Sequence, residues 1–372
     1  MKKLTIILLS LLLFLASCGP KINDKKDDVV QKEEEKTGQT SIVPTYKLSD
    51  EDYRVILPYR TSGARGVITN QMAGNRLDID ELEEGLMRHS KEYFDPNKYY
   101  FEEGQYLDSD TVFSWIDDLN PIVEKGSSEE TYRKNPRYLS HILEQNYLRR
   151  TENNTVELVG ASIGIALKSQ YRFQTEVGGP YYYEDISEKK MLAKGEEIAQ
   201  AVLERLRKVE GLEKVPIMIA LYREEKSGSA VPGNFVAKTY VEENDMSIDG
   251  WDAIKEDYIL FPSNEAEDKH FDDAQIVNTF GVEISDFFPN YVGYIGKGFY
   301  VNDELQKLEI EVPIEFNGKA EIIGFAQYTY GLVKDKFPNK YDIEIKISSS
   351  QRLEGYIYRE AGKEDPTVHI FH

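Results

Sequence analysis

The chain opens with a sharp contrast between apolar and charged positions. Leu4 to Leu15 is an almost unbroken apolar run, which follows two lysines and is closed by the small residues Ala16 and Ser17. A short basic start, an apolar core and a small-residue end are typical of a secretory signal peptide. As a helix, the apolar run would rise about 18 Å, well short of the ~30 Å hydrocarbon core of a bilayer. The pattern therefore predicts a removable signal at residues 1–17 and not a permanent membrane span.

The next stretch, residues 18–47, mixes both signs of charge with few apolar residues and shows no helical or strand periodicity. Such a segment cannot bury enough surface to offset the entropy that ordering would cost. As a coil it would span roughly 30 Å. We expect a flexible charged tether that carries the folded body clear of lipid headgroups.

The folded body is expected to begin near Leu48, and its first part mixes short strands and helices. Asp78 and Glu81 form a plausible capping pair at the start of a helix whose apolar residues, such as Leu82 and Leu86, recur at helical spacing. Proline, glycine and aromatic clusters mark the other boundaries. We predict strands at 53–59 and 99–101, helices at 109–119 and 136–147, and a charged loop at 124–135.

From residue 155 onward, the pattern alternates more regularly. We predict a strand at 156–168, a helix at 189–209 and strands at 215–222 and 234–241, followed by a polar joining segment at 244–269. The C-terminal third predicts helices at 272–288 and 319–337 and strands at 308–316, 341–348, 355–360 and 367–371. A strand–helix–strand–strand order thus occurs twice, and the short turns favour antiparallel pairing.

These elements predict an α+β fold, with mixed or antiparallel sheets packed by helices and a duplicated β-α-β-β unit. At 372 residues the chain exceeds what one core usually serves. We therefore predict a first α+β domain at residues 48–265 and a second at 266–372.

Charge narrows the possible partners of the body. Without the two lysines of the signal, 43 basic residues remain against 66 acidic ones, a formal charge of −23. A body this acidic is repelled by nucleic-acid phosphates, and no basic run offsets the repulsion. It is also repelled by an anionic membrane surface. We therefore expect no nucleic-acid partner, and we expect any membrane attachment to depend on lipid.

Cys18 is the only cysteine of the chain, which excludes an internal disulfide and a multi-cysteine metal site. Its place after Leu15, Ala16 and Ser17 resembles a bacterial lipobox. That resemblance implies cleavage between Ser17 and Cys18 and a diacylglyceryl thioether on the sulfur. Two acyl chains anchor a protein stably, whereas one chain does so only marginally. We expect a lipid-anchored protein on the extracytoplasmic face of the cell membrane, matured by lipoprotein-processing enzymes.

Catalytic and metal-binding motifs give no support for an enzyme. Gly160-Ala161-Ser162-Ile163-Gly164 matches the G-x-S-x-G nucleophile pattern, but the apolar strand continues straight past Ser162, where a nucleophile elbow needs a sharp turn into a helix. The glycines of this strand are expected to let a neighbouring element pack closely. The five histidines lack metal-ligand spacing, and no phosphate-binding glycine motif is present. We predict no cofactor, no metal and no catalytic residue.

Two groups of side chains are candidates for ligand binding. Tyr181, Tyr182 and Tyr183 lie in a long insertion between a predicted strand and helix, and such loops often carry function. Their flat faces and hydroxyls would suit a sugar ring or a peptide. Arg60 and Arg65 stand close together in an acidic chain, where a planar guanidinium could bind a carboxylate or phosphate. The alternatives are that the tyrosines cover the sheet and that the arginines pair with local carboxylates.

The sequence blocks of the body, taken together with the lipobox and tether, resemble the CamS-type sex-pheromone-precursor lipoproteins of Gram-positive bacteria. The blocks that carry the resemblance are Tyr53–Tyr59, Ala64–Gly66, Tyr138–Gln145, Val215–Tyr222 and Val231–Phe235. The resemblance implies that the cleaved signal is trimmed to a short apolar pheromone ending just before the cysteine. In this chain that peptide is Leu11, Leu12, Leu13, Phe14, Leu15, Ala16 and Ser17.

Two other readings stay open for the body, to which the resemblance assigns no catalytic residue. It could be a cell-surface module that binds a peptide or cell-wall glycan, without pheromone activity of the leader. It could also be an extracytoplasmic hydrolase, for which Ser162 would be the candidate nucleophile.

Overall fold

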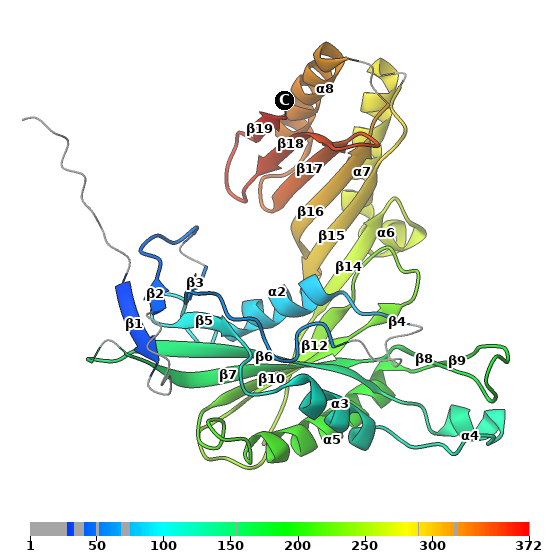
Figure 1. Cartoon of the computed structure of the whole chain (residues 1–372). Helices are drawn as coiled ribbons and strands as arrows, with labels where there is room; N and C mark the ends of the chain where they lie inside the picture. Colours follow the sequence, from blue (N-terminus) through cyan, green and yellow to red (C-terminus); the bar gives the residue numbers. More distant parts are fainter. Residues whose placement is uncertain are drawn as a thin grey trace, which may run out of the picture.

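A computed structural model describes residues 28–32, 41–49, 52–67, 75–153, 155–288, 290–315 and 318–371. The chain forms two sheets with helices packed against them, which confirms the predicted α+β class (Figure 1). Each sheet has its own hydrophobic core. The helices are α2 (Ile79–Ser90), α3 (Ser109–Leu119), α4 (Glu129–Lys134), α5 (Glu188–Leu206), α6 (Asn264–Lys269), α7 (Phe271–Phe287) and α8 (Lys319–Lys336).

The first sheet has nine strands, with the central order β13-β12-β10-β7-β6-β5-β3. Strands β7 and β10 run parallel, joined by the crossover helix α5, and β12 and β6 flank them antiparallel. Helix α2 covers one face, while α3 and α5 cover the other (Figure 1). The strands are β1 (Asp28–Lys32), β2 (Ser41–Val43), β3 (Arg54–Val55), β5 (Tyr100–Glu103), β6 (Leu139–Arg150), β7 (Thr155–Leu167), β10 (Ile217–Arg223), β12 (Asn234–Val241) and β13 (Asp252–Ala253).

The second sheet has six strands in the order β14-β15-β16-β17-β18-β19, and α7 and α8 contribute to the core on one of its faces. Strands β16 and β17 run parallel around α8, with antiparallel neighbours on both sides. The strands are β14 (Glu256–Phe261), β15 (Ile295–Val301), β16 (Glu304–Pro313), β17 (Asp342–Ser348), β18 (Leu353–Arg359) and β19 (Thr367–Ile370). Two small pairs, β4 (Asn75–Arg76) with β11 (Glu225–Lys226) and β8 (Gln170–Phe173) with β9 (Tyr182–Asp185), complete the fold.

The two sheets repeat one connectivity. In each, an antiparallel hairpin leads through a helix into a parallel strand and two more antiparallel strands: β6-β7-α5-β10-β12-β13 in the first and β15-β16-α8-β17-β18-β19 in the second. The predicted strand–helix–strand–strand order is therefore present twice, while the duplication of one ancestral unit stays a prediction. The second sheet begins with β14, ahead of the predicted domain boundary at residue 266.

Several predicted elements have the expected positions. Asp78 caps α2 by accepting a hydrogen bond from the backbone nitrogen of Glu81 at 3.3 Å, and α3 spans the predicted residues 109–119. The glycines of β7 allow the predicted close packing of a neighbouring element. A Cβ atom at Gly160 would lie 2.2 Å from the ring of Phe94, and one at Gly164 would lie 3.3 Å from Leu82 of α2.

The predicted helix at 136–147 is wrong, because these residues belong to β6. Strand β6 lies between β5 and β7, and helices pack on both faces of the sheet, so apolar side chains are buried in both directions. A strand of that kind loses the two-residue alternation that marks a half-exposed strand. Its Leu139, Ile142 and Leu143 then imitate the spacing of a helix.

Two boundaries also differ from the expectations. The predicted charged loop at 124–135 contains the short helix α4, and the strand expected at 53–59 is limited to Arg54–Val55. Residues of the expected tether take part in the first sheet, since β1 pairs with β2 and with β7. Val43 is fully buried against Ile56 and Tyr100 in a small cluster, so the ordered body begins ahead of Leu48.

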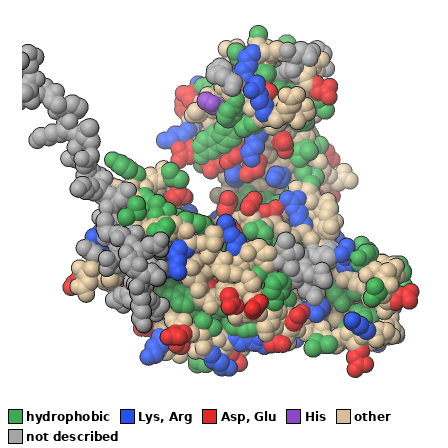
Figure 2. All heavy atoms as spheres, in the orientation of Figure 1, with side chains coloured by type: hydrophobic (Ala, Val, Ile, Leu, Met, Phe, Trp, Pro, Cys, Tyr) green, Lys and Arg blue, Asp and Glu red, His purple; other side chains and the backbone are tan. Residues whose placement is uncertain are grey.

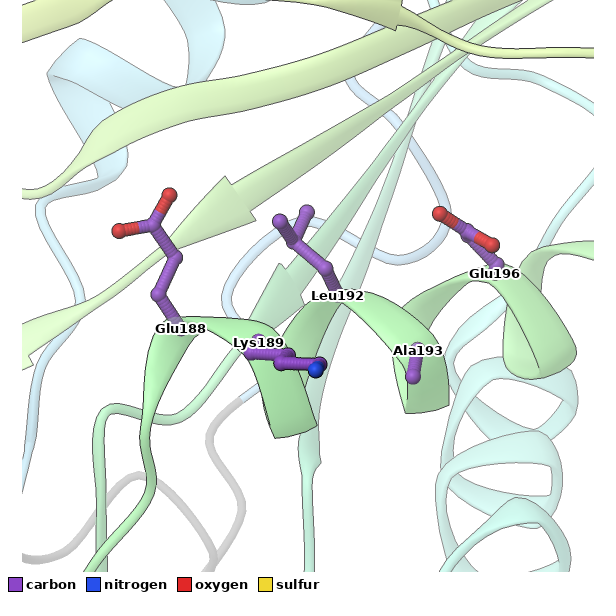
Figure 3. Close-up of a pocket in the computed structure, with 5 residues that line it drawn as sticks. All are labelled: Glu188, Lys189, Leu192, Ala193 and Glu196. Carbon is purple, nitrogen blue, oxygen red and sulfur yellow. The ribbon is translucent and has the colours of Figure 1, made fainter.

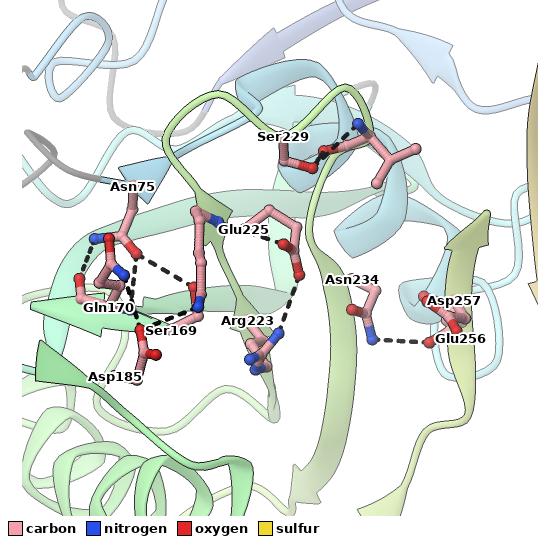
Figure 4. Close-up of polar contacts among 12 residues, drawn as sticks. Asn75, Ser169, Gln170, Asp185, Arg223, Glu225, Ser229, Asn234, Glu256 and Asp257 are labelled. Atoms are coloured by element: carbon pink, nitrogen blue, oxygen red, sulfur yellow. Dashed lines mark hydrogen bonds and ion pairs between the residues drawn. The ribbon is translucent and has the colours of Figure 1, made fainter. Parts of the chain in front are cut away.

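A polar junction links the two sheets. Arg88 of α2 contacts Glu81 at 2.8 Å and Glu256 of β14 at 3.1 Å, and its guanidinium lies 4.6 Å from the ring centre of Phe299. The amide of Asn234 also donates to the carbonyl oxygen of Glu256 at 2.8 Å (Figure 4). The charge-assisted contact between Arg88 and Glu256 fixes the start of β14 to α2, and the bond from Asn234 fixes it to β12.

Within the described ranges, no helix combines the length and apolar character needed to cross a membrane. Figure 2 shows acidic and basic side chains interspersed over the visible face, without a continuous basic area on that face.

Candidate functional site

A cavity of about 900 Å³ lies between α2, the segment from Asp52 to Val67, the end of β5 and the first half of β6. It forms where β5 stops short. Strand β5 pairs only with Gln145 to Leu148 of β6, so the residues of β6 before Glu144 have no neighbouring strand on that side among the described residues. The space that a longer β5 would fill is left open.

Most of the surface of the cavity is apolar. The floor and walls come from strands β3, β5 and β6 and from the inner face of α2, whose Leu82 is fully buried. Concave, largely apolar sites with a few polar groups are typical of small-molecule binding. The main apolar side chains are those of Tyr53, Val55, Leu82, Met87, Phe101 and Leu143.

The carboxylate of Glu103 lies at one wall of the cavity. Its carboxylate pairs with the guanidinium of Arg65 at 2.7 Å and accepts the hydroxyl of Tyr59 and the backbone nitrogen of Ser62, the latter at 2.6 Å. Arg65, one of the predicted ligand residues, therefore lines the cavity but is already paired with a carboxylate. A second arginine of the lining, Arg76, is held by Asp78 at 2.9 Å.

Glu144 is a buried carboxyl group of the cavity wall, only 4% exposed. It accepts hydrogen bonds from the backbone nitrogens of Gln105 and Tyr106 at 3.2 Å and of Leu107 at 2.8 Å. Burial raises the pKa of Glu144, although these hydrogen bonds to the backbone work in the opposite direction. No cation is in contact with it among the described residues.

Glu83 on α2 is a further carboxyl group of the cavity, which Asp52 and Asp80 also line. Glu83 is partly buried, and its carboxylate forms no ion pair or hydrogen bond with another described residue, while its backbone carbonyl accepts a hydrogen bond from the side-chain amide of Gln145 at 2.8 Å. Burial raises the pKa of Glu83 first of all, and the nearby charge of Glu103 adds to the rise while Arg65 opposes it.

His141 of β6 faces the cavity and is 5% exposed. Its Nδ1 has no hydrogen-bond partner among the described residues. Burial lowers the pKa of His141 to about 4, so the imidazole is neutral at pH 7 and can both donate and accept one hydrogen bond. The helix wrongly predicted at 136–147 included this histidine, so its place in the sheet beside the cavity was missed.

The other predicted ligand residues lie elsewhere. Tyr181, Tyr182 and Tyr183 are at the start of β9, on a hairpin outside the cavity. Tyr182 stacks on Phe173 at 5.5 Å, while Tyr181 and Tyr183 are about half exposed. The guanidinium of Arg172 covers the ring of Tyr181 at 4.2 Å.

Arg60 is exposed and does not line the cavity. Of the five predicted ligand residues, Arg65 alone is therefore in its lining.

Polar contacts tie the neighbouring strands to the edge of the cavity (Figure 4). Asn75, which lines the cavity, accepts a hydrogen bond from the backbone nitrogen of Gln170 at 3.0 Å. Gln170 in turn donates to Asp185 of β9 at 2.7 Å. These bonds connect β4 to the β8–β9 hairpin and hold one end of the lining in place.

A second buried polar pair lies at the carboxyl ends of the parallel strands β7 and β10. Lys168 and Glu224 are almost fully buried, and they follow these strands directly. Burial lowers the pKa of Lys168 to about 8 and raises that of Glu224. Neither residue lines the cavity beside α2, and both are almost inaccessible to solvent, so we treat the pair as part of the core.

Two further hollows are poorer candidates. One is a shallow depression on α5, whose lining residues Glu188, Lys189, Leu192, Ala193 and Glu196 all come from this one helix (Figure 3). The other, of about 680 Å³, lies between α4, β9 and α5 and is lined largely by charged side chains. Neither contains a buried polar side chain without a partner.

The serine of the G-x-S-x-G pattern has a structural role. Ser162 is fully buried in β7, which continues to Leu167 as predicted, and its hydroxyl is hydrogen-bonded to that of Ser90 at 2.7 Å. No group of three or more potential metal ligands occurs in the part of the chain that the structure describes. Cys18, Ser17 and the predicted peptide at residues 11–17 lie outside the described residues.

A sequence profile of the CamS sex pheromone cAM373 precursor family matches residues 59–365 of this chain. The chain belongs to the CamS sex pheromone precursor family. The match covers the first sheet from β5 onward, the second sheet up to β18 and the lining of the cavity from Tyr59 onward, and it confirms the resemblance drawn from the sequence blocks.

Solved structures of CamS-family proteins are similar to this chain. A sex pheromone precursor from Lactobacillus salivarius is 30% identical with a TM-score of 0.82, over 89% of this chain and 99% of its own. The C-terminal domain of the sex pheromone staph-cAM373 precursor from Staphylococcus aureus is 27% identical with a TM-score of 0.68, over 79% of this chain and 96% of its own. No curated protein matches the chain.

Proposed function

We propose that this CamS-family chain is the precursor of a lipid-anchored extracytoplasmic protein, and that its leader supplies a short hydrophobic pheromone. The main support for this proposal is the sequence Leu15-Ala16-Ser17-Cys18, which ends the apolar run. The chain also belongs to a family of pheromone precursors. Cys18 would carry the diacylglyceryl group and become the first residue of the mature protein. Its two acyl chains would hold the acidic body at the membrane.

The leader would be processed in two steps. A lipoprotein signal peptidase hydrolyses the peptide bond between Ser17 and Cys18, and an intramembrane protease then hydrolyses the bond before Leu11. The product, Leu11 to Ser17, has six apolar residues and one serine. A peptide of that length and composition enters a bilayer but is too short to span one, so it can be released.

Mass spectrometry of cells and culture supernatant tests this proposal. The expected results are a mature N-terminus at Cys18 that carries diacylglycerol and a supernatant peptide with the mass of residues 11–17. In the Cys18→Ala variant, membrane retention and the peptide should both be lost. A wild-type chain that keeps its leader, or a Cys18→Ala chain that stays as firmly in the membrane fraction, would contradict the proposal.

We further propose that the body is a binding module for a small ligand. The observation that favours this role is the cavity of about 900 Å³, with its apolar walls and the buried Nδ1 of His141, which has no hydrogen-bond partner in the part of the chain that the structure describes. Buried polar groups in proteins nearly always have partners, and a bound ligand could supply one. The family name concerns the leader and assigns no enzymatic reaction to the body.

A filled cavity is the expected consequence of Leu143→Trp, which adds bulk to a partly buried wall residue. The variant should keep the fold and membrane anchoring but lose ligand binding. Leu353→Trp, at a partly buried position of β18 in the second sheet, is the control and should bind as the wild type does. Equal binding by both variants would exclude this cavity as the site.

A further inference from the structure

The lining of the cavity carries more negative than positive charge. Glu83, Glu103 and Glu144 all line it, and Arg65 pairs with Glu103 at 2.7 Å. The other arginine of the lining, Arg76, contacts Asp78 at 2.9 Å and the carbonyl oxygen of Ser229 at 2.8 Å. The other carboxyl groups of the lining, those of Asp52, Asp80, Glu83 and Glu144, form no ion pair with another described residue.

Glu83 is the carboxyl group best placed to meet a ligand. Glu144 is satisfied by three backbone nitrogens, whereas no described side chain or backbone nitrogen bonds the carboxylate of Glu83. Glu83 also lies close enough to Glu103 for the two charges to repel each other. A cation entering the cavity would relieve that repulsion, and its attraction is strengthened by the low dielectric of an apolar site.

His141 gives independent evidence for a ligand. Its side chain is 5% exposed and lines the same cavity, and its Nδ1 lacks a hydrogen-bond partner among the described residues. A neutral imidazole accepts a hydrogen bond from an N–H group through its unprotonated nitrogen.

The apolar walls limit what else the ligand can be. Val55, Leu82, Met87, Phe101 and Leu143 surround the polar groups, so a small hydrated cation would leave this surface against water. Burying an apolar body there is favourable in proportion to the area covered.

We infer that the cavity binds an apolar molecule that carries one primary amine, with the ammonium at Glu83 and Glu103 and the apolar body between α2 and β6. The inference rests on the proposed binding role of the body and adds the chemistry of the ligand. Anionic ligands are disfavoured because five carboxyl groups line the cavity, those of Asp52, Asp80, Glu83, Glu103 and Glu144. Both arginines of the lining, Arg65 and Arg76, already have carboxylate partners.

Three probes of one size separate charge from shape: n-hexylammonium, 1-hexanol and hexanoate. The full chain is placed in nanodiscs of zwitterionic lipid and carries ¹³C-labelled methionine methyl groups. Met87 lines the cavity, so its methyl signal reports occupancy of this site and not partition of the probe into lipid. The chain has six methionines, and Met87→Leu identifies the signal.

At pH 7 n-hexylammonium should shift the Met87 signal and saturate at a concentration at least tenfold lower than 1-hexanol, while hexanoate should leave it unchanged. Glu83→Gln should weaken the binding of n-hexylammonium about tenfold and leave that of 1-hexanol unchanged. Glu84→Gln removes the same charge from the next, exposed position of α2, outside the lining, and should bind as the wild type does.

The contrary outcomes test the amine chemistry of the ligand separately from the binding role of the body. If 1-hexanol or hexanoate binds as tightly as n-hexylammonium, or if Glu83→Gln changes nothing, the amine inference fails while the binding role stands. If no probe moves the Met87 signal while the other methionine signals show a folded chain, the inference and the binding role both fail. The release of the leader peptide is measured separately and is affected by neither result.

Discussion

Acidification should destabilise the first sheet through one residue, His141. The side chain is almost completely buried, and burial is the cause that lowers its pKa from 6.5 to about 4. Below pH 6.5 the unfolded chain therefore takes up a proton that the folded chain refuses. Stability that is fully present above pH 6.5 is lost as the pH falls toward 4.

The size of the effect follows from the same difference in pKa. One pKa unit corresponds to about 1.4 kcal/mol. For a group that titrates at 6.5 unfolded and about 4 folded, linkage gives a loss of about 2 kcal/mol by pH 5 and about 3 kcal/mol by pH 4. Because native domains have only about 5–15 kcal/mol of stability, a loss of this size is readily measured.

Urea unfolding followed by tryptophan fluorescence is the assay. Trp115 and Trp251, the two tryptophans of the chain, pack against the core of the first sheet, so the signal reports the half that contains His141. His141→Gln keeps a hydrogen-bonding side chain but does not titrate. Between pH 7 and 5 the wild type should lose about 2 kcal/mol more than this variant.

His369→Gln is the control, because His369 is exposed on β19, and it should keep the pH dependence of the wild type. Equal pH dependence in the wild type and His141→Gln would refute the reasoning, since it would mean that His141 titrates alike in both states. A loss of stability that is the same at every pH would reflect packing alone.

Three further predictions concern packing and the junction between the sheets. Gly160→Ala should lower the free energy of unfolding in urea by about 1–3 kcal/mol, because its Cβ would lie 2.2 Å from Phe94. In Gly331→Ala, the new Cβ on α8 meets nothing within 4 Å, so this variant should raise the free energy of unfolding by up to about 1 kcal/mol. Burial acts to raise the pKa of Glu256, but His89 and Arg88 hold it below its ordinary value of 4.5, so the stability that this pairing contributes is present above that pH and is lost as the pH falls below it. Arg88→Met should therefore lose less stability than the wild type between about pH 5 and 3 in urea unfolding. Arg359 donates three hydrogen bonds to backbone carbonyls at the end of α8, at 2.6–3.1 Å. Arg359→Met should therefore lower the stability of the second sheet by about 3 kcal/mol, measured from the amide hydrogen exchange of β17 and β18.

The elements that the sequence predicts well have one apolar and one polar face. Helices α3 and α5 and strands β17 and β18 show that contrast, and they lie within a few residues of their predicted ranges. The missed element, β6, is buried on both faces and therefore has no such contrast. The α+β class was still predicted, because the connectivity on either side of β6 was read correctly.

The cavity could not be predicted in the same way. Its lining comes from segments as far apart as Asp52 and Gln145, and its existence depends on where β5 ends. Arg65 was chosen because it is an arginine in an acidic chain, which does not reveal its pairing with Glu103. His141 was discounted as a helical residue. A correct assignment of β6 would have put this histidine in the middle of a sheet, where a polar side chain calls for a partner.

Because the two sheets have the same connectivity, the short strand β5 can be compared with β14, the strand in the corresponding position of the second sheet. In the second sheet, β14 pairs along almost the whole of β15, whereas the corresponding β5 covers only a third of β6. In the second sheet the edge strand β14 is thus nearly as long as its neighbour, whereas in the first sheet the short β5 leaves the cavity open. Because the cavity lies where β6 has no partner strand among the described residues, substitutions of its lining side chains would leave the backbone hydrogen bonds of the sheet intact, so the chemistry of the lining can change without a change of fold.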